Sequence, residues 1–251
     1  MNFPRRGKLS CEKFMTGQPL TPHQQEEYQQ NGYTIQPAVF SKSECDQFID
    51  YMMDLHAGRH QLDGFTPREA NEWGRTHNQH NYDPIAMKWL IDARLYQPLY
   101  DCLQAEPDGI QTMYFWKGSE QRRHQDQFYL PSCMSAWIAL QDVDDKNGTI
   151  YVQAGSHHHR LVTRHDFEAG TEFEGIDYND AVDLQFERNN LPEVTVEVAA
   201  GDVVYFHGVL VHRGGPILEP DSFRHVIANH YIPRCATDWH LNWTRYPVNP
   251  V

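Results

Sequence analysis

Two histidines and one aspartate have the types and spacing of a metal-binding set. Only Gln125 separates His124 from Asp126, and His212 stands much later, at the end of an apolar run. In a β-strand, side chains two residues apart point to the same face, so His124 and Asp126 could reach one ion. Two imidazoles and one carboxylate are the ligands of 2-His-1-carboxylate iron sites, which keep coordination positions open. The sequence therefore predicts a metal site formed by His124, Asp126 and a distant histidine.

The residues alone leave alternatives open. A His-x-Asp pair is common by chance, the chain has 15 histidines, and His124 and Asp126 stand in a polar tract that could be an exposed strand. His207 lies shortly before His212 and competes with it for the distal position. The histidines at 157–159 fall on a predicted turn, so we expect them outside the metal site.

One arginine could supply an anion site next to the metal. Arg224 follows His212 and opens another strand-like run, 224–232. A guanidinium binds a carboxylate through two parallel hydrogen bonds. A metal site with an arginine on the next strand indicates a dicarboxylate co-substrate that chelates the metal. A surface salt bridge is the alternative interpretation of Arg224.

A series of short strands must position these residues. Turn residues separate the segments that we predict as strands, which are 111–116, 123–129, 134–140, 149–152, 194–198, 202–206, 209–212 and 224–232. About eight short strands are typical of a jelly roll, in which two sheets face each other. We therefore expect a mainly β, cupin-like double-stranded β-helix with flanking α-helices.

Two capping boxes predict the flanking helices. Thr21 and Gln24 have the capping-box spacing before one helix, which Gly32 can end. Ser41 and Glu44 have the same spacing before a second helix. Its apolar stripe consists of Cys45, Phe48, Ile49 and Met52. Such a stripe is typical of a helix packed on the outside of a sheet.

Three segments lie outside this pattern, although we expect one domain over 1–251. Residues 1–20 form a polar N-terminal extension. Residues 58–92 are rich in His, Asn and Trp, and we expect a solvated irregular connection there rather than a loop at the mouth of the site. The acidic segment 157–191 interrupts the strands as an insertion, either a lid or a surface excursion. An acidic lid would favour a cationic substrate.

Composition limits the classes of partner and compartment. The net charge of −13 argues against a nucleic-acid partner, because such binding needs a basic face. No apolar run is long enough to span a membrane, and the stretch from Met1 to Arg6 does not begin a secretory signal. The five scattered cysteines indicate reduced thiols. We therefore expect a cytoplasmic protein with a small-molecule substrate, either a monomer or a homodimer.

Several motifs in this order resemble the phytanoyl-CoA dioxygenase family of Fe(II)- and 2-oxoglutarate-dependent oxygenases. The resemblance covers nearly the whole chain. Besides the histidines and Arg224, the resembling segments are 21–39, 111–115, 135–140, 147–152 and 155–157. One departure is Ala154, which stands where the family usually has proline.

The resemblance implies a role for each residue of the predicted metal site. Fe(II) would be held by His124, Asp126 and His212, which makes His207 a core histidine or an outer partner of the site. The far carboxylate of 2-oxoglutarate would be bound by Arg224, and dioxygen would take the remaining coordination position.

The resemblance also indicates which residues line the co-substrate pocket. Trp137 and Met113 stand where the family has pocket residues, although both could equally be core packing, and Gln111 faces the same side as Met113. Gly214 replaces a small hydroxyl residue of the family, so any side-chain contact from that position is lost. Residues that could contact substrate are Asn78, His80, Gln127 and Tyr129.

The implied reaction converts 2-oxoglutarate to succinate and hydroxylates an unactivated C–H bond of a natural-product, amino-acid-like or phosphonate-like molecule. Related halogenases have a small residue in place of Asp126, so the carboxylate favours hydroxylation. Desaturation, ring formation and epimerisation stay open. Two other classes also stay open. One is a cupin-like metalloprotein that uses no 2-oxoglutarate, and the other is a non-catalytic small-molecule-binding barrel.

Overall fold

Two antiparallel sheets with flanking helices make up the computed structural model, which describes residues 17–69 and 74–249. Residues 1–16 of the predicted extension lie outside that range. The large sheet has the order β1-β6-β3-β8-β2-β9 and the small sheet the order β5-β4-β7. The strands of the large sheet are β1 (Tyr33–Gln36), β2 (Pro107–Phe115), β3 (Met134–Ala139), β6 (Val203–His207), β8 (Val226–Pro233) and β9 (Tyr246–Pro247). Those of the small sheet are β4 (Ile150–Gln153), β5 (Glu193–Thr195) and β7 (His212–Gly214).

The two faces of the large sheet are buried in different cores. One face packs against the helices and contributes Tyr114, Ile138 and Tyr205 to a helix-side core. The other face contributes residues such as Trp137 to an inter-sheet core, which also holds Val152 of β4. The alternation follows from the two-residue period of a strand. Side chains on the inter-sheet face of β2, β3 and β8 therefore point toward the small sheet.

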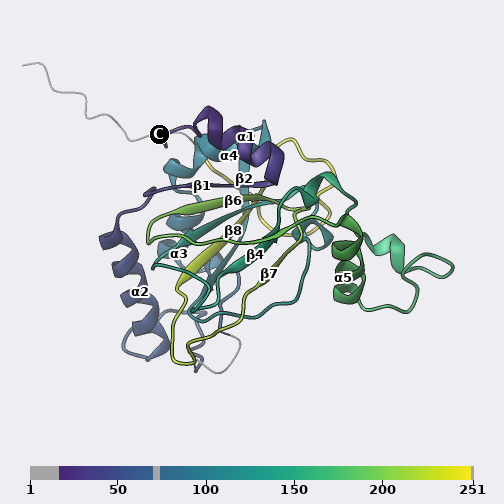
Figure 1. Cartoon of the computed structure of the whole chain (residues 1–251). Coiled ribbons are helices and arrows are strands. Elements are labelled where there is room, and N and C mark those ends of the chain that lie inside the picture. The colour runs from purple at the N-terminus through teal and green to yellow at the C-terminus, as the bar shows by residue number, and fades with distance from the viewer. Residues whose placement is uncertain (1–16, 70–73, 250–251) are drawn as a thin grey trace, which may run out of the picture.

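Five α-helices of the described residues lie around the sheets (Figure 1). They are α1 (Pro22–Asn31), α2 (Lys42–His56), α3 (Pro84–Leu90), α4 (Tyr96–Leu103) and α5 (Tyr178–Asn189). Both predicted capping boxes are confirmed, at Thr21 before α1 and at Ser41 before α2. Gly32 ends α1 with φ of 79°, in the left-handed region that favours glycine. Helices α1 to α4 contribute to the helix-side core, whereas α5 lies at the far right of Figure 1, in the acidic insertion.

The strand predicted over 123–129 is wrong. His124 forms only an isolated bridge with His212, and a 3-10 helix, Asp126–Phe128, follows at once. The reason lies in the partner segment. The chain turns just before His212, where the Leu210 N–H bonds to the His207 carbonyl, so no extended partner continues beside residues 125–129.

The irregular connection predicted over 58–92 is also wrong in part. Helix α3 forms within it, with Leu90 fully buried. Upstream, the Thr76 N–H bonds to the Tyr114 carbonyl and the Asn78 N–H to that of Thr112. This segment therefore lies along β2 and saturates part of its backbone, as an edge strand would.

Two compositional expectations can be compared with the described residues. Within 17–69 and 74–249, no helix is long and apolar enough to cross a membrane. The cysteines in this range, Cys45, Cys102, Cys133 and Cys235, are not paired in disulfides. Cys11 lies outside the described residues.

Candidate metal centre

Backbone pairing brings the two predicted histidine ligands face to face. The His124 N–H bonds to the His212 carbonyl at 2.9 Å, and the His212 N–H returns a bond to the His124 carbonyl at 3.1 Å. Asp126 follows on the turn, and its Oδ1 lies 3.6 Å from His124 Nε2 and 3.7 Å from His212 Nε2. The three candidate ligand atoms lie within 4.8 Å of one another, and all three residues are buried. One ion could contact all three.

Hydrogen bonds fix which nitrogen of each ring faces this point. His124 Nδ1 donates to the Arg122 carbonyl at 2.8 Å, and His212 Nδ1 donates to the Leu210 carbonyl at 3.0 Å. Because a carbonyl only accepts, each Nδ1 carries the proton and each Nε2 keeps its lone pair. Burial, with the nearby His212, lowers the pKa of His124 to about 3. At neutral pH His124 is therefore the neutral form that binds metals.

The second oxygen of the Asp126 carboxylate, Oδ2, has polar contacts of its own. Ser135 Oγ donates to Asp126 Oδ2 at 2.8 Å, and His230 Nε2 lies 3.3 Å from the same oxygen. Burial alone would raise the pKa of Asp126, but His212 and His230 outweigh it and the pKa falls below its usual range. The carboxylate is therefore ionised at neutral pH. Sequence reasoning missed His230, although its even spacing from Arg224 on a predicted strand was a usable signal.

Arg224 is a buried cation in the same cavity as the metal candidates. Its side chain is 2% exposed, and its Nη1 donates to the Gly148 carbonyl at 2.7 Å. Its Nε is buried and has no hydrogen-bond partner among residues 17–69 and 74–249. Among the described residues, no carboxylate lies within 4.0 Å of it, so the surface salt bridge considered for Arg224 is wrong. Burial, with nearby Arg75, lowers its pKa to about 10, which leaves it charged at neutral pH. A buried charge of this kind needs an anionic partner.

A cavity of about 50 Å³ joins Arg224 to the triad. Besides Arg224, three of the residues predicted to contact the co-substrate line it, namely Met113, Trp137 and Gly214. Gln111 faces the same side of β2 as Met113, as expected, and its register partner on β8 is His230. Gln111 itself does not line the cavity. The remaining lining residues include Phe115, Gln121, Phe206 and Ala228.

The loop before His124 covers the cavity at Gly214. The Gly214 N–H bonds to the Gln121 carbonyl at 2.9 Å, and a Cβ on Gly214 would lie 2.8 Å from the Gln121 backbone nitrogen. No side chain fits there. The Gln121 amide donates to His124 Nε2 at 3.1 Å and accepts from Arg75 at 3.0 Å. Gln121 is a site residue that sequence reasoning missed, because only its place in the polar tract before His124 pointed to it.

The four residues predicted to contact substrate do not line the cavity. His80 packs against Tyr246, and Gln127 donates to the Cys133 carbonyl. Tyr129 is 43% exposed on the turn after Asp126. The Asn78 N–H bonds to the Thr112 carbonyl of β2. Contact of these four residues with a substrate stays a prediction.

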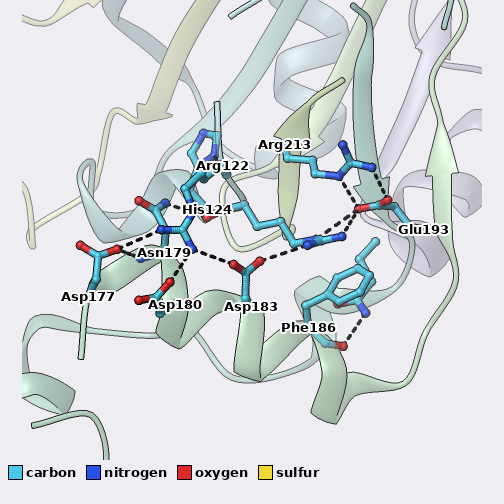
Figure 2. Close-up of polar contacts among 11 residues, drawn as sticks. Arg122, His124, Asp177, Asn179, Asp180, Asp183, Phe186, Glu193 and Arg213 are labelled. Atoms are coloured by element: carbon cyan, nitrogen blue, oxygen red, sulfur yellow. Dashed lines mark hydrogen bonds and ion pairs between the residues drawn. The ribbon is translucent and has the colours of Figure 1, made fainter. Parts of the chain in front are cut away.

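Ion pairs connect helix α5 and strand β5 to the segments that carry His124 and His212 (Figure 2). Arg122, two residues before His124, contacts Asp180 and contacts Asp183 at 2.9 Å. Arg123 contacts Asp183 at 3.1 Å and Glu193 at 3.0 Å. Each arginine therefore joins the segment before the first ligand to α5 or to the strand that follows it.

The second ligand segment joins the same network. Arg213, directly after His212, contacts Glu193 at 2.6 Å (Figure 2). The insertion also has its own apolar core, in which Phe173 and Val182 pack with Val211. The acidic insertion is thus packed against the residues that flank the metal site, rather than being a purely solvated excursion.

Arginines balance most of the acidic side chains in this insertion. The carboxylates paired with arginine are Asp166, Glu172, Asp177, Asp180 and Asp183. Glu168 pairs with His165, and Glu174 accepts from the Gly170 N–H. If the insertion is a lid, its acidic residues would favour a cationic substrate, and this pairing with arginines weakens that argument.

Two antiparallel sheets thus place a buried His, Asp, His set and a buried arginine around one cavity, an arrangement that could hold a metal ion and an anion. The model of the phytanoyl-CoA dioxygenase (PhyH) family matches residues 28–226, and the chain belongs to this family. Phytanoyl-CoA dioxygenase 1 of Oryza sativa subsp. japonica is 31% identical over 188 residues, and phytanoyl-CoA dioxygenase of Arabidopsis thaliana is 29% identical over 183. Both matches cover 69% of this chain but only 62% of the relative.

Solved structures share the fold at lower sequence identity. EctD from S. alaskensis with 2-oxoglutarate and 5-hydroxyectoine has a TM-score of 0.67 and 20% identity, over 92% of this chain and 82% of EctD. The carbocyclase SnoK from nogalamycin biosynthesis has a TM-score of 0.66 and 22% identity, over 86% and 87%. HygX from Streptomyces hygroscopicus with nickel and 2-oxoglutarate has a TM-score of 0.64 and 19% identity, over 88% and 90%.

Proposed function

We propose that this protein is an Fe(II)- and 2-oxoglutarate-dependent oxygenase that hydroxylates an unactivated C–H bond of a small molecule. The observation that carries the proposal is Arg224, a buried guanidinium without a carboxylate partner among the described residues, in the cavity that the triad also lines. A dicarboxylate that reaches from the metal to Arg224 supplies the missing counter-charge. We also propose that the two sheets form the double-stranded β-helix that such enzymes use.

The residues present fit the metal and the co-substrate. His124, Asp126 and His212 would hold Fe(II) with two neutral imidazoles and one carboxylate, a donor set that suits non-haem iron. Bound iron and 2-oxoglutarate supply the oxidising power for hydroxylation with dioxygen, and succinate is the co-product. Arg224 orients the far carboxylate of the co-substrate, while the rings of Phe115 and Trp137, at 5.1 and 5.8 Å from its guanidinium, exclude water.

The solved relatives by fold support this class of reaction and of substrate. HygX holds 2-oxoglutarate with nickel, and EctD holds 2-oxoglutarate with 5-hydroxyectoine. SnoK is a carbocyclase, so ring formation is a second outcome on the same fold. Asp126 favours hydroxylation over halogenation, because a carboxylate takes the coordination position that a halide would need. A natural-product, amino-acid-like or phosphonate-like substrate fits the proposal.

The test is an anaerobic titration of Fe(II) and 2-oxoglutarate, followed by the visible metal-to-ligand charge-transfer band. We expect a band in the wild type and none in His212→Ala. Arg224→Ala should need roughly 10- to 100-fold more 2-oxoglutarate, because it loses charge-assisted hydrogen bonds to the far carboxylate.

Arg234→Ala is the matched control, since Arg234 follows β8 at its other end and pairs with Asp108 instead. We expect its 2-oxoglutarate dependence to match the wild type. A folded, iron-loaded wild type without the band would contradict the proposal. It would favour the cupin-like metalloprotein or the non-catalytic barrel instead.

A further inference from the structure

We propose that His230 is a positioning residue, which acts with Ser135 to make Asp126 present a single oxygen to the metal. The inference rests on the proposed function, because it takes Asp126 as a metal ligand. It concerns a residue of β8 that lines the same cavity but is not one of the three candidate metal ligands.

The two oxygens of Asp126 have different surroundings. Oδ1 faces both ligand nitrogens, at 3.6 and 3.7 Å. Oδ2 faces away from them, toward Ser135 Oγ at 2.8 Å and His230 Nε2 at 3.3 Å. Ser135 and His230 are opposite each other in the register of β3 and β8, so both residues of one cross-strand pair contact Asp126 Oδ2.

Single-oxygen ligation matters for the number of open coordination positions. An octahedral metal with three protein ligands keeps three positions, two for a chelating co-substrate and one for dioxygen. If the carboxylate turned and bound through both oxygens, it would occupy one of them. Donors on Oδ2 oppose that turn, and they orient the carboxylate before the metal arrives.

The tautomer of His230 follows from its two nitrogens. The ring is 4% exposed, and its Nδ1 is buried without a partner among the described residues. A buried N–H without an acceptor costs more than an unused lone pair, and Asp126 Oδ2 can only accept. The proton therefore lies on Nε2, the nitrogen that is 3.3 Å from Asp126 Oδ2.

A histidine at the start of the same strand provides a comparison. His225 is also buried, but its Nδ1 pairs with the Tyr114 hydroxyl at 2.6 Å in the helix-side direction, and it does not line the cavity. Both rings are large, buried and close in sequence. A substitution that disturbs only the packing of this strand should therefore have similar effects at His225 and at His230.

The experiment measures Co(II) affinity by the visible absorption of the bound ion, in the full chain and without co-substrate. His230→Phe keeps the ring and removes its donor, and we expect a 10- to 100-fold weaker affinity, the range for lost outer partners of metal ligands. His230→Gln keeps an N–H donor and should restore most of the affinity. His225→Phe should leave it unchanged. Where His230→Phe folds poorly, His230→Leu carries the same prediction with a smaller side chain.

Non-additivity separates positioning from packing. In an Asp126→Ala background, His230→Phe should cause no further loss of Co(II) affinity, because its target is gone. An equal loss in both backgrounds, or no loss in either, would overturn the inference. If the wild type binds neither Co(II) nor Fe(II), the proposed function fails. If the wild type binds metal and His230→Phe matches it, only the inference fails.

Discussion

Gly214 shows how a missing side chain can shape a cavity. The atoms nearest to Gly214 are backbone atoms, since a Cβ on Gly214 would lie 2.8 Å from the Gln121 backbone nitrogen and 3.0 Å from that of Glu120. Backbone atoms cannot swing aside as a flexible side-chain end can. At Gly214 the backbone of the loop before His124 thus occupies the space that a side chain would need, and the same loop brings the Gln121 amide to the site.

We predict that Gly214→Ser displaces this loop instead of restoring a hydroxyl contact. The expected result is a lower melting temperature and weaker 2-oxoglutarate binding, measured by thermal unfolding and by the charge-transfer band. Gly118→Ala is the control in the same loop, because its added Cβ meets the Ile217 side chain, at 2.9 Å, and not backbone at that distance. Tighter 2-oxoglutarate binding by Gly214→Ser would contradict the prediction.

The contact between α5 and the metal-ligand segments depends on arginines of unequal burial. Arg123 is 24% exposed, pairs with Asp183 and Glu193, and lies 3.9 Å over the Phe186 ring. Arg122 is 51% exposed and pairs only with exposed carboxylates. Exposed ion pairs contribute little, whereas a partly desolvated network with a ring contact contributes more.

We therefore predict that Arg123→Gln loosens α5 and that Arg122→Gln scarcely does. Hydrogen exchange followed by mass spectrometry should show roughly ten-fold faster exchange of the α5 amides in Arg123→Gln, as expected for a loss of about 1.4 kcal/mol. Equal protection in the two variants would mean that apolar packing at Phe173 and Val182 holds the insertion in place by itself.

Elements defined by local chemistry could be predicted from the sequence, and elements defined by a distant partner could not. The capping boxes at Thr21 and Ser41 follow from residues three positions apart, and the structure confirms both. The segment 123–129 fails as a strand because its partner turns away before His212, which no local pattern records. His230 was overlooked for a similar reason, since its importance depends on the register between β3 and β8.

At the scale of the whole molecule, buried histidines make stability depend on pH. His80 and His225 are 4% and 7% exposed, and burial lowers the pKa of each to about 4. In the unfolded chain such groups titrate near 6.5. Between these values the unfolded state binds more protons, so stability is present above about pH 6.5 and is lost as the pH falls toward 4.

We predict that the urea midpoint falls between pH 7 and pH 5, and that it falls less in a His80→Phe, His225→Phe double variant. Each histidine contributes at most about 1.4 kcal/mol per pH unit to the free energy of unfolding. The measurement uses a chelator and constant salt, so that metal binding and screening do not change. Parallel pH profiles for the two proteins would show that other groups carry the acid sensitivity.

The orientation of each candidate imidazole ligand is fixed by its own chain segment. The carbonyl two residues before each ring holds its Nδ1, at Arg122 for His124 and at Leu210 for His212. Neither ring has to find its orientation when an ion arrives, so little conformational entropy is lost on binding. The rate at which this protein loads with metal should then be limited by dehydration of the ion and its passage into the cavity, and not by rearrangement of the ligands.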